Sequence, residues 1–455
     1  MKRILVLGAG QSSPYLISYL IEQAEEHDWF VVVGDINLSL ARKRVDNCPR
    51  AAAIRFDVND AVMRTTHISK ADVVVNFLAP QFQYLIALEC LRHKTHVVSA
   101  SYEDIRVKEL DQDANRLGIL ILNEVGLDPG IDHMSAMSII DKIHKEGGII
   151  ESFTSYGSGL PSPEASVNPL KYCITWNPRN VAMAGEEGAL YMENNQIKIL
   201  PYQQVFQRTW PVKVEGVGTL EAYPNRNSLI YQELFGLERL HTMIRGTLRY
   251  PGWSEVWQQL VKLGLPNELL AIPNLKERSY QELTQMFLPI NVSGSNLKNQ
   301  VASYLGISPT GRIMETMEWL GLFSSKKIGI NARTSAEVLI DLLKKKLPLP
   351  EGTRDMVILL HQVIACCSGK SGKRELIRSL LVEYGNPNGF TAIAKTVGLP
   401  AGIATKLLLT EQLQLTGCHI PTHPAIYVPV LRELEKCGIR FKETRQPFDL
   451  KKFVK

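Results

Sequence analysis

The 455-residue sequence predicts an α/β protein that begins with a doubly wound parallel sheet and continues into a second α/β domain. Three observations predict this. Short runs rich in Val and Ile alternate with amphipathic stretches up to residue 124. Continuous apolar strands are typical of a parallel sheet that helices cover on both faces, and right-handed crossovers make such a sheet doubly wound. The length exceeds what one hydrophobic core usually organises, so two or three domains are expected.

The first part alternates strands and helices in a regular order. Strands are expected at 3–8, 30–36, 51–58, 72–79, 96–100 and 118–124. Amphipathic helices are expected between them at 13–26, 38–45, 83–93 and 107–117, with a short helix between the third and fourth strands. This order predicts a first domain over residues 1–130.

The pattern changes after residue 130. A helix is expected at 131–148, several strands within 149–250, and an almost wholly helical stretch at 253–346. Strands return at 354–366 and 374–384, where they flank "SGKSGK" as a hairpin, and helices follow at 391–410 and 425–437. We therefore expect a second α/β domain made of 131–252 and 347–410, which an all-α insertion at 253–346 interrupts.

Composition indicates an ordinary soluble protein of the reducing cytoplasm. The net charge of +5 is spread thinly, and no basic face interleaved with aromatic residues predicts nucleic-acid binding. The seven cysteines form no CxxC pair, so neither a metal site nor a disulfide framework is predicted. The apolar start "MKRILVLGAGQ" is too short for a signal peptide, and no run approaches the length of a membrane span.

A glycine turn follows the first expected strand. Gly8, Ala9 and Gly10 open a helix, and glycine there permits a tight turn and close approach of a pyrophosphate to the helix N-terminus. Ser13 occupies the third position of the GxGxxG pattern and is small enough for normal packing of helix on strand. In this context the turn predicts dinucleotide binding on a Rossmann domain.

Asp35 ends the second expected strand, about 20 residues after the turn, where a carboxylate accepts hydrogen bonds from the ribose hydroxyls of NAD. A carboxylate there would repel a 2′-phosphate, so we expect NAD in preference to NADP. The alternative is a helix N-cap, although Asn37 or Ser39 could take that role.

Asp128 lies in "GLDPGIDH", directly after the sixth expected strand. One interpretation is a helix N-cap followed by Pro129 at the first helical position, which residue types alone favour. The other is a place in the ligand crevice, which open α/β sheets form at the carboxyl edge of their strands. His133 would lie on the first helical turn and face solvent or core.

Three arginines lie among turn residues of the second half. They are Arg226 in "AYPNRNS" and Arg245 and Arg249 in "RGTLRY". Surface ion pairs are the simple interpretation. A convergent set would instead indicate two-pronged recognition of carboxylates.

Motifs spread in order along the chain resemble the saccharopine reductase family, the glutamate-forming saccharopine dehydrogenases. They include "LGAGQSSPYL", "SASYED", "NEVGLDPGIDHM", "SYGSGLPSPEASVNPLKY", "RGTLRYPGW" and "AKTVGLPAGIATKLLL". The resemblance implies a Rossmann domain, a substrate and dimerisation domain with an all-α insertion, and a C-terminal segment, about 411–455, packed back on the first domain. It also implies a homodimer in amino-acid metabolism, acting on saccharopine with a nicotinamide cofactor.

The implied reaction is reversible. Hydride leaves the lysine-side carbon of saccharopine for the nicotinamide, and the resulting imine is hydrolysed to glutamate and aminoadipate semialdehyde. The family positions imply Asp128 and Tyr102 as catalytic residues, with Asp128 as the acid/base candidate. They imply substrate contacts at Ser101, Tyr102, Asp128, Arg226, Thr247, Leu248 and Arg249. They imply nucleotide contacts at Gly8, Ala9, Gly10, Gln11, Ser12, Asp35, Ile36, Asp57, Val58, Leu78, Ala100, Ser101, Leu127, Pro129 and Thr175.

Two departures from the family pattern bear on function. Relatives that use NADP carry "CRT" where this chain has Asp35-Ile36-Asn37, and relatives read "SYCGGLP" where Gly157 stands here. Two alternatives stay open. A carboxynorspermidine-like dehydrogenase performs the same imine reduction on a substrate with fewer carboxylates, and a dinucleotide-sensing protein would have no turnover. The sequence does not fix the direction of the reaction in the cell.

Overall fold

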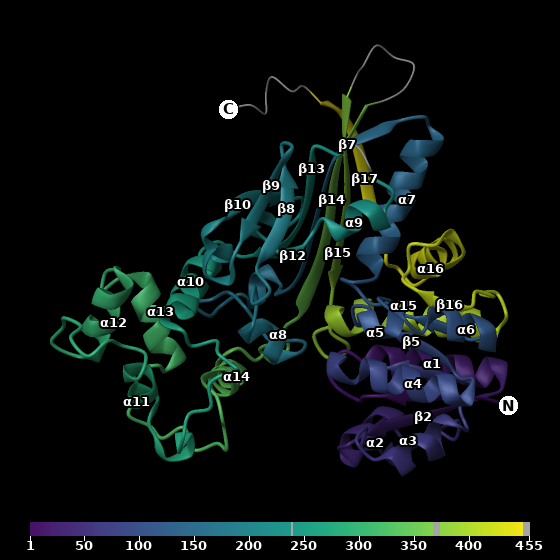
Figure 1. Cartoon of the computed structure of the whole chain (residues 1–455), viewed down its shortest axis with the longest axis horizontal. Coiled ribbons are helices and arrows are strands. Elements are labelled where there is room, and N and C mark those ends of the chain that lie inside the picture. The colour runs from purple at the N-terminus through teal and green to yellow at the C-terminus, as the bar shows by residue number, and fades with distance from the viewer. Residues whose placement is uncertain (238–239, 367–373, 449–455) are drawn as a thin grey trace. The chain divides into compact units, whose positions relative to one another are not determined.

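The computed structural model describes residues 1–237, 240–366 and 374–448, and the chain forms two compact units (Figure 1). The first contains Met1–Ile150 and Ala365–Lys455, and the second contains Glu151–Ile364. These limits differ from the expected ones, because the helices at 131–148 and 391–410 fall in the first unit rather than the second. The expected "SGKSGK" hairpin loop lies outside the described residues.

The first unit is built on a parallel sheet with the order β16-β6-β5-β4-β1-β2-β3. Its strands are β1 (Lys2–Leu7), β2 (Trp29–Asp35), β3 (Ala51–Arg55), β4 (Val73–Asn76), β5 (His96–Ser99), β6 (Leu120–Leu122) and β16 (Gly417–His419). The first six are the predicted strands, so the predicted fold class is confirmed. The seventh comes from the C-terminal part and pairs with β6, where Cys418 lies opposite Ile121.

Helices cover this sheet and supply its core. They are α1 (Pro14–His27), α2 (Leu38–Val45), α3 (Ala61–Ile68), η1 (Pro80–Phe82), α4 (Gln83–His93), α5 (Ile105–Lys108), α6 (Asp111–Leu117) and α15 (Ala392–Leu409), while α7 (Ile131–Lys145) and α16 (Pro424–Lys436) of the same unit pack on each other. Leu5, Val32 and Val74 of three strands share one buried cluster with Ile86 and Ala87 of α4. The alternation of apolar runs therefore specified both layers.

Helix α15 explains why the expected domain limit moves. A Cβ at Gly398 would stand 2.9 Å from the backbone nitrogen of Leu16, so α15 lies directly against α1. This helix also corrects an expectation, because its length and mean hydropathy of 1.3 are sufficient to span a membrane. However, 83% of it is buried within the chain, as the core helix of a soluble protein would be.

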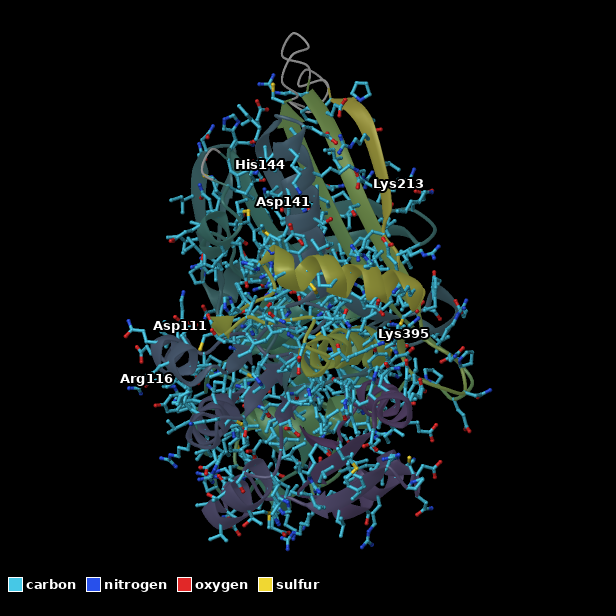
Figure 2. All side chains as sticks on the ribbon, turned by 90° about the vertical axis from the view of Figure 1, so that its right-hand side faces the viewer. Asp111, Arg116, Asp141, His144, Lys213 and Lys395 are labelled. Carbon is cyan, nitrogen blue, oxygen red and sulfur yellow. The ribbon has the colours of Figure 1, made fainter. Side chains whose placement is uncertain are left out.

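The C-terminal part of the first unit packs on α7. Figure 2 places Asp141 and His144 on α7, and the Tyr427 hydroxyl of α16 donates a hydrogen bond to the Asp141 carboxylate. Strand β15 (Arg374–Tyr384) pairs antiparallel with β17 (Lys442–Phe448), and Lys142 forms an ion pair with Glu443 at 3.0 Å.

The second unit contains a mixed sheet in which β10-β11-β13-β7-β14 are neighbours. Its strands are β7 (Ile149–Pro161), β8 (Ala189–Glu193), β9 (Gln196–Leu200), β10 (Trp210–Val214), β11 (Gly218–Pro224), β12 (Arg226–Asn227), β13 (Thr242–Arg249) and β14 (Asp355–Cys366). Strand β13 runs parallel to β7 and antiparallel to β11, and it carries three of the predicted substrate contacts.

Residues 253–346 are helical and contain no strand within that fully described range. Their helices are α10 (Trp253–Leu263), η4 (Leu275–Glu277), α11 (Tyr280–Gln285), α12 (Leu297–Leu305), α13 (Arg312–Leu320) and α14 (Ser335–Lys346), while η2 (Pro163–Ala165), α8 (Pro178–Ala182), η3 (Tyr202–Gln207) and α9 (Ile230–Leu234) precede them. Trp253 and Trp257, one turn apart on α10, stack with ring centroids 4.5 Å apart.

Candidate active site

The glycine turn lies at the carboxyl end of β1 and begins α1. Gly8 has φ +101°, and a Cβ there would stand 2.7 Å from the Phe77 carbonyl oxygen, so glycine is required. Gly10 has open space where a Cβ would be. Ser13 is buried and its hydroxyl donates to the Gly10 carbonyl at 3.1 Å, so serine fits the third position. This geometry suits a dinucleotide pyrophosphate at the helix N-terminus.

Asp35, the last residue of β2, is engaged by the backbone around it. Its Oδ2 accepts a hydrogen bond from the Ala9 amide at 2.8 Å, and its Oδ1 accepts one from the Asn37 amide at 2.8 Å. The N-cap of α2 is Asn37, whose side chain accepts from the Leu40 amide. Asp35 is therefore not the helix cap, and it fastens the glycine turn to the end of β2.

Arg44 brings a positive charge to the same turn. Its Nε donates to the Ala9 carbonyl at 3.2 Å, and the half-buried guanidinium forms no ion pair with a carboxylate of the described residues. Burial lowers the pKa of this guanidinium. An arginine near this position is what a 2′-phosphate requires. The sequence pattern did not single out Arg44, because it looked like one of several solvated cations in "ARKRV".

Most of the other predicted nucleotide contacts follow the ends of neighbouring parallel strands, where an open α/β sheet binds its ligand. In the first unit these are Gln11, Ser12, Ile36, Asp57, Val58, Leu78, Ala100, Ser101, Leu127 and Pro129. Thr175 differs, since it is buried in the second unit. The individual contacts with a nucleotide remain predictions.

Tyr102 and Asp128, the two residues predicted to be catalytic, lie in contact with each other. The Tyr102 hydroxyl donates a hydrogen bond to Asp128 Oδ1 at 3.2 Å, and Asp128 is exposed while Tyr102 is half-buried. Helix α7 begins at Ile131 with Gly130 as its N-cap residue, so the alternative of Asp128 as a helix cap is wrong. An exposed carboxylate beside a phenol, at the carboxyl edge of the sheet, can exchange protons with a substrate or with water.

A buried charged cluster lies next to this pair. His133 is fully buried, with Nε2 2.8 Å from Glu124 Oε2 and Nδ1 3.1 Å from Asp132 Oδ2. Burial alone would lower the pKa of His133, but Asp132 and Glu124 together raise it to about 9. The side chain is thus an imidazolium at neutral pH.

Arg249, at the end of β13 in the second unit, is a buried cation whose guanidinium lies over the ring of Trp253 at 4.8 Å and over that of Tyr172 at 5.0 Å. Its NH1 atom donates to Ser158 Oγ and to the Leu248 carbonyl, both at 2.9 Å.

No carboxylate of the described residues forms an ion pair with Arg249, and its buried Nε has no hydrogen-bond partner there. Glu221, its register partner on β11, accepts instead from the Ser254 amide at 3.2 Å. Because a charge is rarely buried without a counterion, this site is ready to receive an anion.

The other two predicted arginines have different surroundings. Arg226 forms an ion pair with Glu187 at 3.0 Å, and both side chains are exposed. Arg245 is buried with its guanidinium 4.2 Å from the centroid of the Tyr231 ring, and its amide donates to Ser228 Oγ. Thr247 lies opposite Gly157 in the register of β13 and β7. Arg249 is therefore the arginine whose environment most clearly suits a carboxylate.

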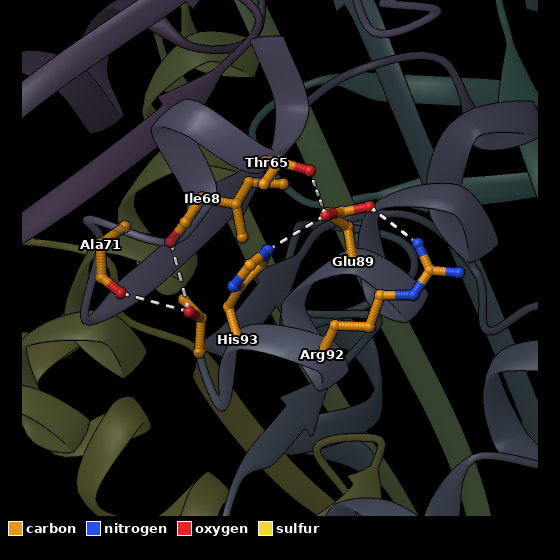
Figure 3. Close-up of polar contacts among 7 residues, drawn as sticks. Thr65, Ile68, Ala71, Glu89, Arg92 and His93 are labelled. Carbon is orange, nitrogen blue, oxygen red and sulfur yellow. Dashed lines mark hydrogen bonds and ion pairs between the residues drawn. The ribbon is translucent and has the colours of Figure 1, made fainter. Parts of the chain in front are cut away.

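A second buried carboxylate in the first unit offers a contrast. Glu89 accepts hydrogen bonds from Thr65 at 2.8 Å and Arg92 at 3.3 Å, and it contacts His93 Nε2 at 3.1 Å (Figure 3). Burial alone would raise the pKa of Glu89, but these partners outweigh it and lower the pKa. The carboxylate of this cluster is saturated with partners, so the cluster stabilises the fold.

A parallel sheet with a glycine turn of this kind at the carboxyl end of its first strand is typical of a dinucleotide-dependent oxidoreductase. Residues 4–122 match the saccharopine dehydrogenase NADP binding domain and residues 126–439 match the saccharopine dehydrogenase C-terminal domain. The chain belongs to the saccharopine dehydrogenase (L-glutamate-forming) family, as the sequence motifs predicted.

Individual relatives match nearly the whole length of this chain. The chain is 32% identical to saccharopine dehydrogenase [NADP(+), L-glutamate-forming] of Schizosaccharomyces pombe, over 97% of this chain and 99% of the relative. A solved structure of the apo saccharopine dehydrogenase (L-Glu forming) from Saccharomyces cerevisiae matches with a TM-score of 0.85 and 31% identity, over 98% of this chain and 100% of that one. Mitochondrial α-aminoadipic semialdehyde synthase of Bos taurus is 33% identical, with the match covering 47% of that protein.

These comparisons correct the expected cofactor. The preference for NAD over NADP is wrong, because the matched domain is described as NADP binding and the fungal relatives are named for NADP(+). The structure supplies a physical reason. Both oxygens of Asp35 accept hydrogen bonds from backbone amides, and Arg44 adds a positive charge at the same turn.

Proposed function

We propose that the chain catalyses the reversible oxidation of saccharopine to glutamate and aminoadipate semialdehyde in lysine metabolism, with NADP⁺ as hydride acceptor. Family membership supports the reaction class, and the buried guanidinium of Arg249 carries the assignment of a carboxylate-bearing substrate. Saccharopine joins two amino-acid skeletons through one secondary amine, so it presents several carboxylates. A buried arginine without an acidic partner in the described residues is suited to one of them.

The reaction balances without further reactants except water. The lysine-side carbon loses a hydride and the adjacent nitrogen loses a proton, which gives an imine. Water then adds to the imine carbon, and the C–N bond breaks to release the amine of glutamate and the aldehyde. The nicotinamide, when bound, supplies the hydride acceptor, and one proton is released overall.

In this proposal the Tyr102–Asp128 pair moves the proton. Asp128 is exposed and holds an oxygen toward the Tyr102 hydroxyl, so its carboxylate can take a proton from water as water attacks the imine. Tyr102 fixes the orientation of that carboxylate. In the second unit, Arg249 anchors a substrate carboxylate with its neighbours Thr247 and Leu248.

The cofactor half of the proposal rests on the first unit. Gly8 and Gly10 leave room for the pyrophosphate, and Arg44, which donates to the Ala9 carbonyl of the turn, pairs with no carboxylate of the described residues. We assign the 2′-phosphate of NADP⁺ to Arg44, since an arginine binds phosphate through several donors at once.

The test is an absorbance assay of NADPH formation from saccharopine, with glutamate measured as product. We expect turnover with NADP⁺, and Asp128→Asn should lower kcat by about 100-fold or more while NADP⁺ binding is retained. Absence of NADPH formation with saccharopine would refute the proposal. Faster oxidation of a carboxynorspermidine-type substrate, which carries fewer carboxylates, would favour the alternative dehydrogenase instead. A homodimer in the cytoplasm is a further part of the proposal, and light scattering on the purified chain tests the dimer.

A further inference from the structure

A buried cluster of three charged side chains connects the two segments that carry Tyr102 and Asp128. We infer that Glu124, His133 and Asp132, here called the buried triad, position the Tyr102–Asp128 pair, so that His133 is a positioning residue for proton transfer. The inference rests on the proposed function, because that reaction gives the pair its task. The three side chains are exposed by 6%, 0% and 2% respectively.

Glu124 holds the segment that carries Tyr102. Its Oε1 accepts a hydrogen bond from the Glu103 amide at 3.0 Å, and its own amide donates to the Ser101 carbonyl at 3.0 Å. Tyr102 therefore lies between two residues that are both bound to Glu124. Oε2 of the same carboxylate is the atom that contacts His133.

The backbone of Glu124 supports a functional role for it. Its φ of +60° is the left-handed conformation, which is strained for a residue that bears a side chain. Such strain persists where surrounding contacts enforce it and is concentrated at functional sites. The conformation directs the carboxylate to both the Glu103 amide and His133.

Asp132 holds the turn that carries Asp128. Its Oδ1 accepts from the Gly130 amide at 2.7 Å, and its own amide donates to the Leu127 carbonyl at 3.0 Å. The turn from Leu127 to Gly130 is thus closed by one residue at both ends. Oδ2 of Asp132 lies 3.1 Å from Nδ1 of His133.

His133 joins these two halves through its two ring nitrogens. A protonated imidazole donates from both nitrogens, whereas a neutral imidazole donates from one alone. With the proton present, Nε2 is hydrogen bonded to Glu124, and the charged ring attracts Asp132 as an ion pair at 3.1 Å, although Nδ1 makes no hydrogen bond within the described residues. Without the ring, two buried carboxylates face each other without the positive charge between them, so the Tyr102 and Asp128 segments lose their common support.

The experiment compares His133→Gln with the parent chain and repeats the comparison in a Tyr102→Phe background. We expect His133→Gln to lower kcat about 10-fold or more in the parent chain, within the range that proton transfer contributes. Affinity for NADP⁺, measured by fluorescence titration, should change less than about twofold, because the glycine turn is untouched. In the Tyr102→Phe background the further loss should be small, since the positioned pair is already broken.

A second readout does not depend on turnover. Hydrogen exchange measured by mass spectrometry should be faster in peptides covering 101–104 and 127–131 of the His133→Gln chain, with strands β1 and β4 unchanged. Glu124→Gln keeps an acceptor for the Glu103 amide but removes the charge, and it should accelerate exchange in the same peptides. It also serves as the test variant if His133→Gln does not fold.

His93→Gln is the matched control. It removes another imidazole that contacts a buried carboxylate in the same unit, that of Glu89 (Figure 3). We expect kcat within about twofold of the parent and unchanged exchange at 101–104 and 127–131. The reason is that His93 is partly exposed, and substitutions at such positions usually have small effects. The positioning role would be overturned if His133→Gln lowered kcat by the same factor in the parent chain and in the Tyr102→Phe background. Unchanged exchange in both peptides would overturn it as well. Absent turnover in the parent chain, with faster exchange in His133→Gln, would refute the proposed function and leave the positioning intact.

Discussion

Arg249→Met is the substitution that separates substrate binding from folding most clearly. The methionine keeps the length of an apolar stem among Trp253, Tyr172 and Tyr223, and it removes the buried charge. If Arg249 anchors a substrate carboxylate, charge-assisted hydrogen bonds worth about 1.5–3 kcal/mol are lost. That loss corresponds to a fall in kcat/KM of roughly 10- to 150-fold.

The effect on stability should be small, because two contributions oppose each other. A buried guanidinium without a counterion costs several kcal/mol in desolvation. Its cation–π contacts with the three rings return about 0.5–2 kcal/mol each, and its hydrogen bond to Ser158 adds to them. We therefore expect the free energy of unfolding of Arg249→Met to lie within about 2 kcal/mol of the parent value.

Initial rates over a range of saccharopine concentrations, together with urea unfolding, measure both quantities. If the arginine binds the ground state and the transition state alike, KM for saccharopine should rise while KM for NADP⁺ stays unchanged. Arg208→Met is the matched control, because Arg208 also lies over a tryptophan, Trp210, in the second unit but is paired with Glu193 at 2.8 Å. A large loss of stability in Arg249→Met with unchanged KM would refute the reasoning and make Arg249 a structural cation.

Three further outcomes follow from the first unit. Asp35→Ala removes the acceptor for two backbone amides, so affinity for NAD and NADP⁺ should fall together, by about 10-fold in titrations. A gain for NADP⁺ alone would contradict this. Arg44→Ala should lower the affinity for NADP⁺ by about 10-fold and change the affinity for NAD by less than about twofold. Equal losses of affinity for both cofactors would show that Arg44 does not bind the 2′-phosphate. The raised pKa of His133, about 9 against an ordinary 6.5, contributes up to about 3 kcal/mol of stability below pH 6.5, which is lost as pH rises through 9. Urea unfolding between pH 6 and 10 measures this loss of stability. The titratable groups that face His133 are Glu124 and Asp132, and Glu103 lies beside Glu124. If the His133→Gln chain showed the same pH dependence, another group would be responsible.

The sheet of the first unit could be predicted from the sequence because its signals are local. Apolar β-branched runs such as Val31–Val33 specify buried strands, and Gly8 specifies the turn through its own conformation. The seventh strand, Gly417–His419, could not be found in this way, since three residues carry no periodicity and its partner Leu120 is far away in sequence.

The site was predicted unevenly for the same reason. Asp128 and Arg249 were singled out by residue type and position and Tyr102 by the family motifs, whereas Arg44 was not singled out. What distinguishes Arg44 from the other cations of "ARKRV" is its hydrogen bond to the Ala9 carbonyl. That carbonyl is 35 residues away in sequence, so the local pattern does not show the contact. The role of Asp35 was misjudged because the sequence shows its charge but not the two amides that already occupy it.

Three buried charged groups show how partners separate structural from functional positions. Glu89 has a donor from Thr65, from Arg92 and from His93, so its charge is fully compensated and it needs no ligand. Arg249 has neutral acceptors and aromatic rings but no carboxylate within the described residues, so we propose a substrate carboxylate as its counterion. His133 lies between these cases. It has two carboxylates for one positive charge, and each of them also holds a backbone segment that carries a catalytic candidate. Because both carboxylates hold segments of this kind, we attribute the triad to positioning and not to the fold alone.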